Sequence, residues 1–93
     1  YVFYLVEQLT RTAVNLGFTP AQAAELVTGT FLGSVELLVA SGREPEELRR
    51  QVTSPNGTTQ RAIAELEKGD LTGLFDRATA SALARAKEMA EGR

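Results

Sequence analysis

A run of hydroxyl-bearing side chains in residues 52–59 is the part of this sequence best suited to chemistry. Four of its eight positions carry a hydroxyl, and a proline, an asparagine and a glycine lie among them: Thr53, Ser54, Pro55, Asn56, Gly57, Thr58 and Thr59. The run lies between two helical patterns and opens the second one. Unpaired amides and the partial positive charge at a helix N-terminus favour carboxylates and phosphates. The sequence therefore predicts that this loop and the helix after it hold a small anion.

The individual residues of the loop fit such a site. Gly57 removes side-chain bulk where a ligand would approach the backbone, Pro55 restricts the turn, and Asn56 tolerates left-handed dihedral angles. The hydroxyls of Thr58 and Thr59 can add donors to the backbone amides. No lysine follows the glycine, so the loop is not a Walker A motif. On spacing alone, an ordinary helix–loop–helix turn with threonine caps is an open alternative.

Five helical patterns must position this loop, and the sequence contains no strand pattern. The helices are predicted at residues 1–16, 20–41, 45–52, 58–68 and 71–91. Thr19 with Pro20 and Gln22 is typical of a capping box with proline at the first helical position, and Asp70 can cap the last helix. A glycine can end the first, second and fourth helices: Gly17, Gly42 and Gly69. The predicted fold class is all-α.

The apolar positions of these helices exceed what five helices of this length can bury among themselves. The first and second helices are apolar on more than one side. Gly29 and Gly33 form a G-x-x-x-G step that would let another helix approach closely. We therefore expect an obligate oligomer whose subunits share a core. Coverage by a missing N-terminal part of the protein is the alternative, and both explanations can hold together.

Composition and charge argue against several classes of site. The 93 residues contain no cysteine and no histidine, which excludes disulfides, thiol nucleophiles and imidazole catalysis and argues against a zinc site. A formal net charge of −2 gives no electrostatic reason to expect nucleic acid or an acidic membrane surface. The longest uninterrupted apolar run is far below the roughly 18 residues of a membrane span, and no signal peptide is visible. The absence of cysteine permits a cytoplasmic setting, and we expect no metal, membrane or nucleic-acid partner.

The hydroxyl-rich loop belongs to a longer pattern. It reads Leu48-x-x-x-Val52-Thr53-Ser54-Pro55-Asn56-Gly57-Thr58-Thr59-x-x-Ala62-Ile63-x-x-Leu66-Glu67. This pattern resembles the signature of the pyrroline-5-carboxylate reductase family. Three flanking segments are similar to the C-terminal domain of that family, so the resemblance covers residues 1–93: Tyr1-Val2-Phe3-Tyr4, Leu16-Gly17-Phe18-Thr19 and Leu38-Val39-Ala40-Ser41-Gly42. Asn56 stands where the family usually has glycine, and Arg50 where it often has an acidic residue.

The resemblance implies an oxidoreductase that reduces 1-pyrroline-5-carboxylate to L-proline with NADPH or NADH, the last step of proline biosynthesis. It also implies a homodimer of interlocked helical C-terminal domains, which some members assemble into larger oligomers, and an N-terminal Rossmann domain for the dinucleotide. Ser54, Gly57, Thr58 and Thr59 would line the substrate site. Amides near Gly57 to Thr59 would bind the carboxylate, and the Thr59 hydroxyl would act as the catalytic group on the ring nitrogen.

Residues 1–93 contain no G-x-G-x-x-G motif and no β-α-β pattern, so they provide no dinucleotide site of their own. The uncapped helix start at Tyr1 is typical of a fragment that lacks its N-terminal part. The isolated chain is therefore expected to dimerise and to be inactive. Two other classes stay open: a stand-alone helical dimerisation or adaptor module, and a helix-turn-helix nucleic-acid binder. The net charge and the lack of a basic recognition helix count against the second class.

Overall fold

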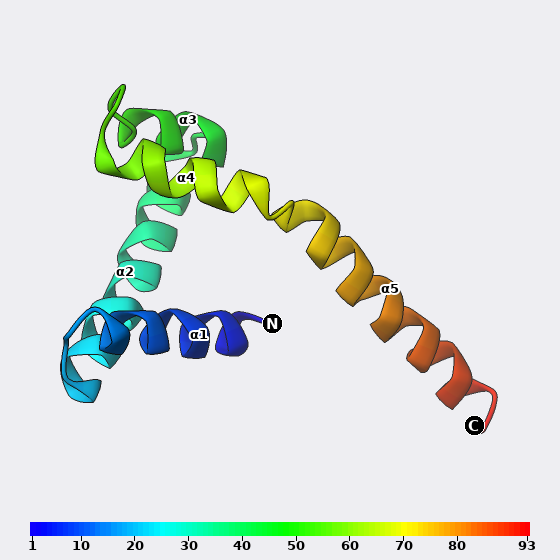
Figure 1. Cartoon of the computed structure of the whole chain (residues 1–93). Coiled ribbons are helices and arrows are strands. Elements are labelled where there is room, and N and C mark those ends of the chain that lie inside the picture. The colour runs from blue at the N-terminus through cyan, green and yellow to red at the C-terminus, as the bar shows by residue number, and fades with distance from the viewer. The chain divides into compact units, whose positions relative to one another are not determined.

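The computed structural model describes residues 1–93 and contains five α-helices and no strand (Figure 1). The helices are α1 (Val2–Asn15), α2 (Pro20–Ser41), α3 (Pro45–Gln51), α4 (Thr58–Lys68) and α5 (Leu71–Ala90). The all-α prediction is confirmed, and every helix begins and ends within one residue of its predicted bounds. The chain divides into two compact units, Tyr1–Leu48 and Arg49–Arg93. The assignment of residues 1–93 to a single domain stays a prediction.

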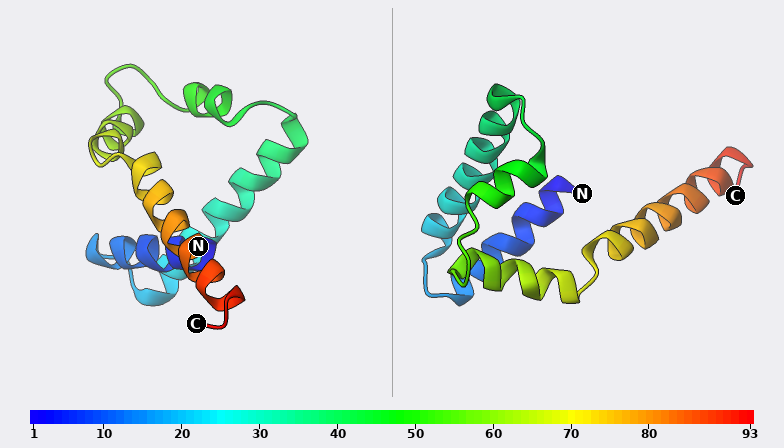
Figure 2. Two further views of the ribbon diagram at one scale, coloured as in Figure 1. Left: turned by 90° about the vertical axis from the view of Figure 1, so that its right-hand side faces the viewer. Right: turned by 90° about the horizontal axis from the view of Figure 1, so that it is seen from above.

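Backbone hydrogen bonds close the turn between α1 and α2. Gly17 N–H donates to Val14 O at 3.0 Å and Phe18 N–H donates to Ala13 O at 3.3 Å, which are the two bonds of a Schellman motif. Gly17 has a φ of 112°, which L side chains rarely adopt, and this explains the glycine. The prediction that Gly17 ends the first helix is confirmed, and α1 lies across the N-terminal half of α2 (Figure 1 and Figure 2).

The start of α2 has the predicted capping box. Thr19 Oγ1 accepts from Gln22 N–H at 3.2 Å, and Gln22 Oε1 accepts from Thr19 N–H at 3.0 Å. Pro20 is the first helical residue, where a missing N–H leaves no hydrogen bond unmade. Gly42 ends the helix in the left-handed conformation, with a φ of 64°. Both ends of α2 are therefore set by local residues.

The packing of α1 on α2 buries little apolar surface. Ala13 and Ala23 are the only buried residues of the chain, at 8% and 0% exposure. Several large apolar side chains of α2 stay exposed: Leu26, Leu32, Val35, Leu37 and Val39. A Cβ built on Gly29 or Gly33 meets no atom within 4 Å, so no part of the chain uses the close approach that these glycines permit. The predicted excess of apolar surface is confirmed.

By length and composition alone, α2 could also span a membrane. The core helix of a soluble protein passes the same test, so the property is weak evidence for a membrane. A count of uninterrupted apolar residues does not detect this property of α2. Glycine, serine and threonine interrupt the apolar residues of the helix, while its mean hydropathy stays high. The absence of a membrane partner stays a prediction.

No residue of α3, α4 or α5 is buried. The apolar pattern of residues 58–68 predicts that Ala62, Ile63 and Leu66 face inward, but only Ile63 is half-buried, and Ala62 and Leu66 are exposed. Along α5, Leu74, Leu83 and Met89 are each more than half exposed. The expectation of an inward face is therefore wrong for Ala62 and Leu66 within the second unit, because the short helices of this unit form no core around them.

Asp70 forms the junction between α4 and α5. Gly69 follows the last residue of α4, as predicted, but it is right-handed, whereas Asp70 is left-handed with a φ of 48°. Aspartate is one of the few non-glycine residues that adopt this conformation, because its short carboxylate can hydrogen-bond locally. Here Asp70 Oδ1 accepts from Gly73 N–H at 3.2 Å, which confirms the predicted cap. A Cβ on Gly73 would lie 2.1 Å from Asp70 Oδ2, so Gly73 makes room for the cap.

Replacing Asp70 by alanine is expected to lower the free energy of unfolding by about 2 kcal/mol. The substitution removes the cap of α5 and leaves a side chain in the left-handed region without a compensating hydrogen bond. Chemical denaturation followed by circular dichroism measures the change. Asp76→Ala, at an exposed position inside α5, is the control and should shift stability by less than about 0.5 kcal/mol. Equal effects of the two substitutions would contradict the role of Asp70.

Candidate functional site

The segment between α3 and α4 contains a tight turn. Gly57 N–H donates to Ser54 O at 2.9 Å, and Pro55 and Asn56 are the two central residues of this turn. Asn56 has a φ of 60°, and a positive φ at this position, preceded by proline, is typical of a type II turn. The prediction that Asn56 adopts left-handed dihedral angles is confirmed. The turn therefore fixes the direction in which the chain enters α4.

Close packing inside the loop favours glycine at position 57. Its φ of −86° and ψ of 179° are open to any residue, so backbone conformation does not explain the glycine. A Cβ on Gly57 would lie 3.1 Å from Ser54 O and 3.2 Å from Ser54 Cβ, which is tighter than ordinary van der Waals contact. The glycine thus lets the start of α4 approach Ser54, and it brings these two predicted site residues together.

Three backbone amides at the start of α4 have no hydrogen-bond acceptor within the chain. They belong to Thr58, Thr59 and Gln60, whereas the amides on either side donate to Ser54 O and, from Arg61, to Gly57 O at 3.3 Å. The residue before the helix is Gly57, and no side chain caps this helix end. The alternative of a turn with threonine caps is therefore wrong for α4. The three amides are free to bind an anion.

The four hydroxyls of the loop fall into two groups. Thr53 Oγ1 donates to Arg49 O at 2.5 Å and so extends the last turn of α3. The hydroxyls of Ser54, Thr58 and Thr59 form no hydrogen bond with the chain. Thr59 is half-buried, while Ser54 and Thr58 are exposed. The three hydroxyls without a partner are the three predicted for the site, and Thr53 has a structural role.

Gln60 belongs to the loop although the sequence analysis did not single it out. Its side-chain Oε1 accepts a hydrogen bond from the backbone N–H of Asn56. Gln60 is the third residue of α4, the same place that Gln22 has in α2, where it completes a capping box. A search for glutamine or glutamate three residues after the expected N-cap would have found it.

The charges around the loop favour an anionic ligand. No acidic residue lies in the first turn of α4, and none occurs between Glu47 and Glu65. Arg61 is the fourth residue of α4, where a cation opposes the helix dipole, and its side chain forms no ion pair within the chain. By contrast, α3 has the usual arrangement with Glu46 and Glu47 in its first turn. The start of α4 therefore presents donors and positive charge without a carboxylate.

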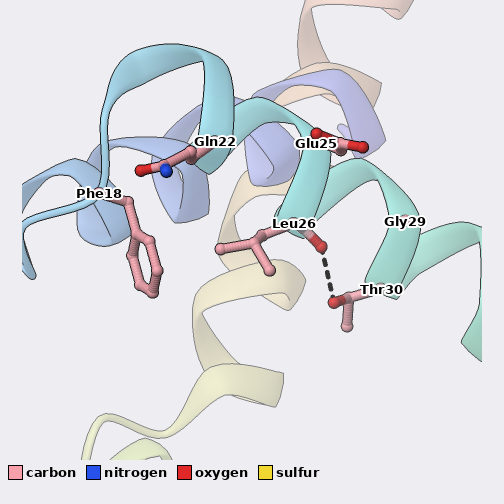
Figure 3. Close-up of a pocket in the computed structure, with 6 residues that line it drawn as sticks. All are labelled: Phe18, Gln22, Glu25, Leu26, Gly29 and Thr30. Atoms are coloured by element: carbon pink, nitrogen blue, oxygen red, sulfur yellow. Dashed lines mark hydrogen bonds between the residues drawn. The ribbon is translucent and has the colours of Figure 1, made fainter.

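Two pockets of the chain are lined by residues outside the loop. A pocket of about 570 Å³ lies along α2, and Figure 3 shows six residues that line it: Phe18, Gln22, Glu25, Leu26, Gly29 and Thr30. The Thr30 hydroxyl there donates to Leu26 O at 2.7 Å, so it is already used. A second pocket, of about 400 Å³, is lined by residues of α4 and α5 with Arg49. Neither pocket is lined by Ser54, Gly57, Thr58 or Thr59.

The chain offers little to a metal or a dinucleotide. No group of three histidine, cysteine, aspartate or glutamate residues is placed to hold a metal ion. A dinucleotide site of the Rossmann type needs a strand, a glycine-rich turn and a helix in succession. With five helices and no strand, the residues of this chain do not fit such a cofactor.

Comparison with known proteins gives a consistent result. Residues 1–89 match the family model for pyrroline-5-carboxylate reductase dimerisation. The chain is 40% identical over 89 residues to the pyrroline-5-carboxylate reductase of Corynebacterium melassecola, a match that covers 96% of this chain and 33% of that relative. It is 38% identical over 91 residues to the reductase of Pseudomonas aeruginosa, covering 98% of this chain and 33% of the relative. The chain thus spans about a third of the length of these curated relatives.

Proposed function

This chain belongs to the pyrroline-5-carboxylate reductase dimerisation family, and we propose that it is the C-terminal, dimerising and substrate-binding domain of such a reductase. The parent enzyme is an oxidoreductase that converts 1-pyrroline-5-carboxylate to L-proline with NADPH or NADH, in the cytoplasm, as the last step of proline biosynthesis. The observation that carries the substrate-binding part is the set of three amides and three hydroxyls without partners at the start of α4.

The free amides of Thr58, Thr59 and Gln60 bind the carboxylate of the substrate in this proposal. A carboxylate is favoured at a helix N-terminus by both the unpaired donors and the helix dipole. The amide of Gly57 is occupied by Ser54 O, so Gly57 contributes by allowing the close approach of Ser54. Ser54 and Thr58 add hydroxyl donors at the same edge of the site.

Thr59 is the residue we propose for the catalytic role. Its hydroxyl is half-buried and has no partner in the chain, so it is available to donate to the ring nitrogen of the substrate. This hydrogen bond orients the C=N bond and provides a route for the proton that the nitrogen gains. A threonine hydroxyl is a weak acid, so its contribution is mainly orientation.

The proposal places the reducing cofactor outside residues 1–93, because a chain of five helices without a strand offers no site of the Rossmann type. This domain holds the substrate while another part of the enzyme supplies the hydride. The exposed apolar side chains of α2 and α5 support a homodimer in which a second copy covers them.

The isolated chain is expected to dimerise and to be inactive. Light scattering coupled to size-exclusion chromatography should give twice the mass of 10.0 kDa. A turnover assay with NADPH and 1-pyrroline-5-carboxylate should show no reduction, because the chain has no cofactor site. Measurable reduction by these 93 residues would contradict the proposal that the cofactor is bound by another part of the enzyme. A monomer would contradict the dimerising role and favour coverage of the apolar faces by another part of the protein.

A further inference from the structure

We infer that Gln60 is a positioning residue of the substrate site, and that its uncharged side chain keeps the start of α4 available for an anionic substrate. This inference rests on the proposed function. Gln60 is not among the residues that carry the family resemblance, and its role follows from its hydrogen bond to Asn56 and from the charges around it.

The hydrogen bond from Asn56 N–H to Gln60 Oε1 ties the turn to the helix that follows it. Asn56 is the residue with a φ of 60°, a conformation that is unfavourable for a residue with a side chain. Gly57 and Ser54, which follow and precede the central pair of the turn, are in close contact. Gln60 therefore holds Asn56 in its left-handed conformation and ties the turn that begins at Ser54 to the free amides of α4.

The lack of charge on Gln60 is as important as its hydrogen bond. Glutamate can make the same bond at the third position of a helix, and the helix dipole would stabilise it there. A carboxylate at this position would also repel an anion bound by the amides of Thr58 and Thr59, because the two negative charges would share one helix end. The structure has glutamine here and Arg61 next to it, so nothing within the chain competes with a bound anion.

The test compares Gln60→Glu and Gln60→Met in the full-length reductase, with KM for 1-pyrroline-5-carboxylate and kcat measured at saturating NADPH. For Gln60→Glu we expect KM to rise about tenfold with kcat within about twofold, and the rise to shrink as sodium chloride is added. The thermal unfolding midpoint should stay unchanged, since the hydrogen bond is kept. For Gln60→Met we expect a smaller rise in KM, about threefold, without salt dependence, because only the hydrogen bond is lost.

Inhibition by L-proline and by L-prolinamide distinguishes charge repulsion at the start of α4 from a general distortion of the substrate site. Gln60→Glu should weaken inhibition by L-proline, which carries a carboxylate, and leave inhibition by L-prolinamide unchanged. Gln22→Glu is the control, because Gln22 is also the third residue of its helix and its side chain also accepts a backbone N–H, from the N-cap residue Thr19. Its KM should stay within about twofold of the parent enzyme.

The inference is overturned if Gln60→Glu leaves KM unchanged, or if Gln22→Glu raises KM as much. If Gln60→Glu does not fold, the result depends on Gln60→Met, and an unchanged KM for that variant overturns the positioning role. Failure of the proposed function would give a different result in the turnover assay from failure of the Gln60 inference. In that case the parent enzyme shows no turnover of 1-pyrroline-5-carboxylate, whereas failure of the Gln60 inference leaves the activity of the parent enzyme intact.

Discussion

Thr59→Ala in the full-length reductase is expected to lower kcat/KM for 1-pyrroline-5-carboxylate about 100-fold, the usual cost of removing one preorganised donor from an active site. The Thr59 hydroxyl is half-buried and unpaired within the chain, so its removal disturbs no existing hydrogen bond. The loss should therefore appear in the kinetics and leave the oligomeric state and the unfolding midpoint unchanged. Steady-state kinetics, with sedimentation velocity on the same sample, measure both.

Two further variants make the Thr59 result specific. Thr59→Ser keeps a hydroxyl and should retain most of the activity. Thr53→Ala removes a hydroxyl from the same loop, but that hydroxyl already donates to Arg49 O, so the change should affect stability by about 1 kcal/mol and leave the catalytic rate nearly intact. Unchanged kinetics for Thr59→Ala, or equal kinetic losses for Thr53→Ala, would remove Thr59 from the site.

Leu32→Asp is expected to abolish dimerisation of the chain. Leu32 is 59% exposed, and Gly29, Val35 and Val39 share its side of α2 at helical spacing. If a second copy covers this face, the substitution removes a buried leucine and inserts a carboxylate in an apolar interface. Two-fold symmetry doubles the loss, to roughly 5 kcal/mol or more, so the dissociation constant should rise at least about 1,000-fold. Sedimentation equilibrium over a range of protein concentrations measures this change.

Controls on the same helix separate interface disruption from a general effect of charge. Leu32→Met keeps an apolar side chain of similar volume and should leave the dimer intact. Ser34→Asp places a carboxylate two residues from Leu32, on the opposite side of α2, and should have little effect. Since α2 keeps its capping box and its glycine C-cap in all three variants, the helix itself should persist. A fully dimeric Leu32→Asp protein would show that a different surface forms the dimer.

Helix boundaries could be predicted from the sequence because local residues determine them. Thr19, Pro20 and Gln22 satisfy the first amides of α2 within four residues of chain. Gly17 supplies the positive φ that ends α1, and Asp70 supplies the cap of α5. Each interaction joins residues at most five positions apart, so spacing and residue type are sufficient to predict it. The position of the hydroxyl-rich loop between α3 and α4 follows for the same reason.

The sequence alone also determined which residue types gather at the loop, but it did not determine which of their atoms are free. Thr53 and Thr59 are both threonines of the loop, yet one donates to Arg49 O and the other has no partner. The Gly57 amide, expected to face the ligand, is used inside the turn, so the free amides begin one residue later. The spacing of Gln60 after Gly57 could have marked it as a capping candidate, but only the structure shows that its side chain accepts from the Asn56 N–H. Hydrogen-bond partners depend on the path of the backbone in three dimensions, which residue type does not specify.

The burial of apolar side chains could likewise be predicted in part from the sequence and in part only from the tertiary structure. The sequence determined that the helices carry more apolar surface than 93 residues can cover, and two buried alanines in the folded chain agree with this. Only the tertiary structure decided where the uncovered surface lies: along α2 around the open Gly29 and Gly33, and along α5. The physical reason is that helix formation satisfies the backbone locally, whereas burying a side chain requires a second surface that this chain does not supply.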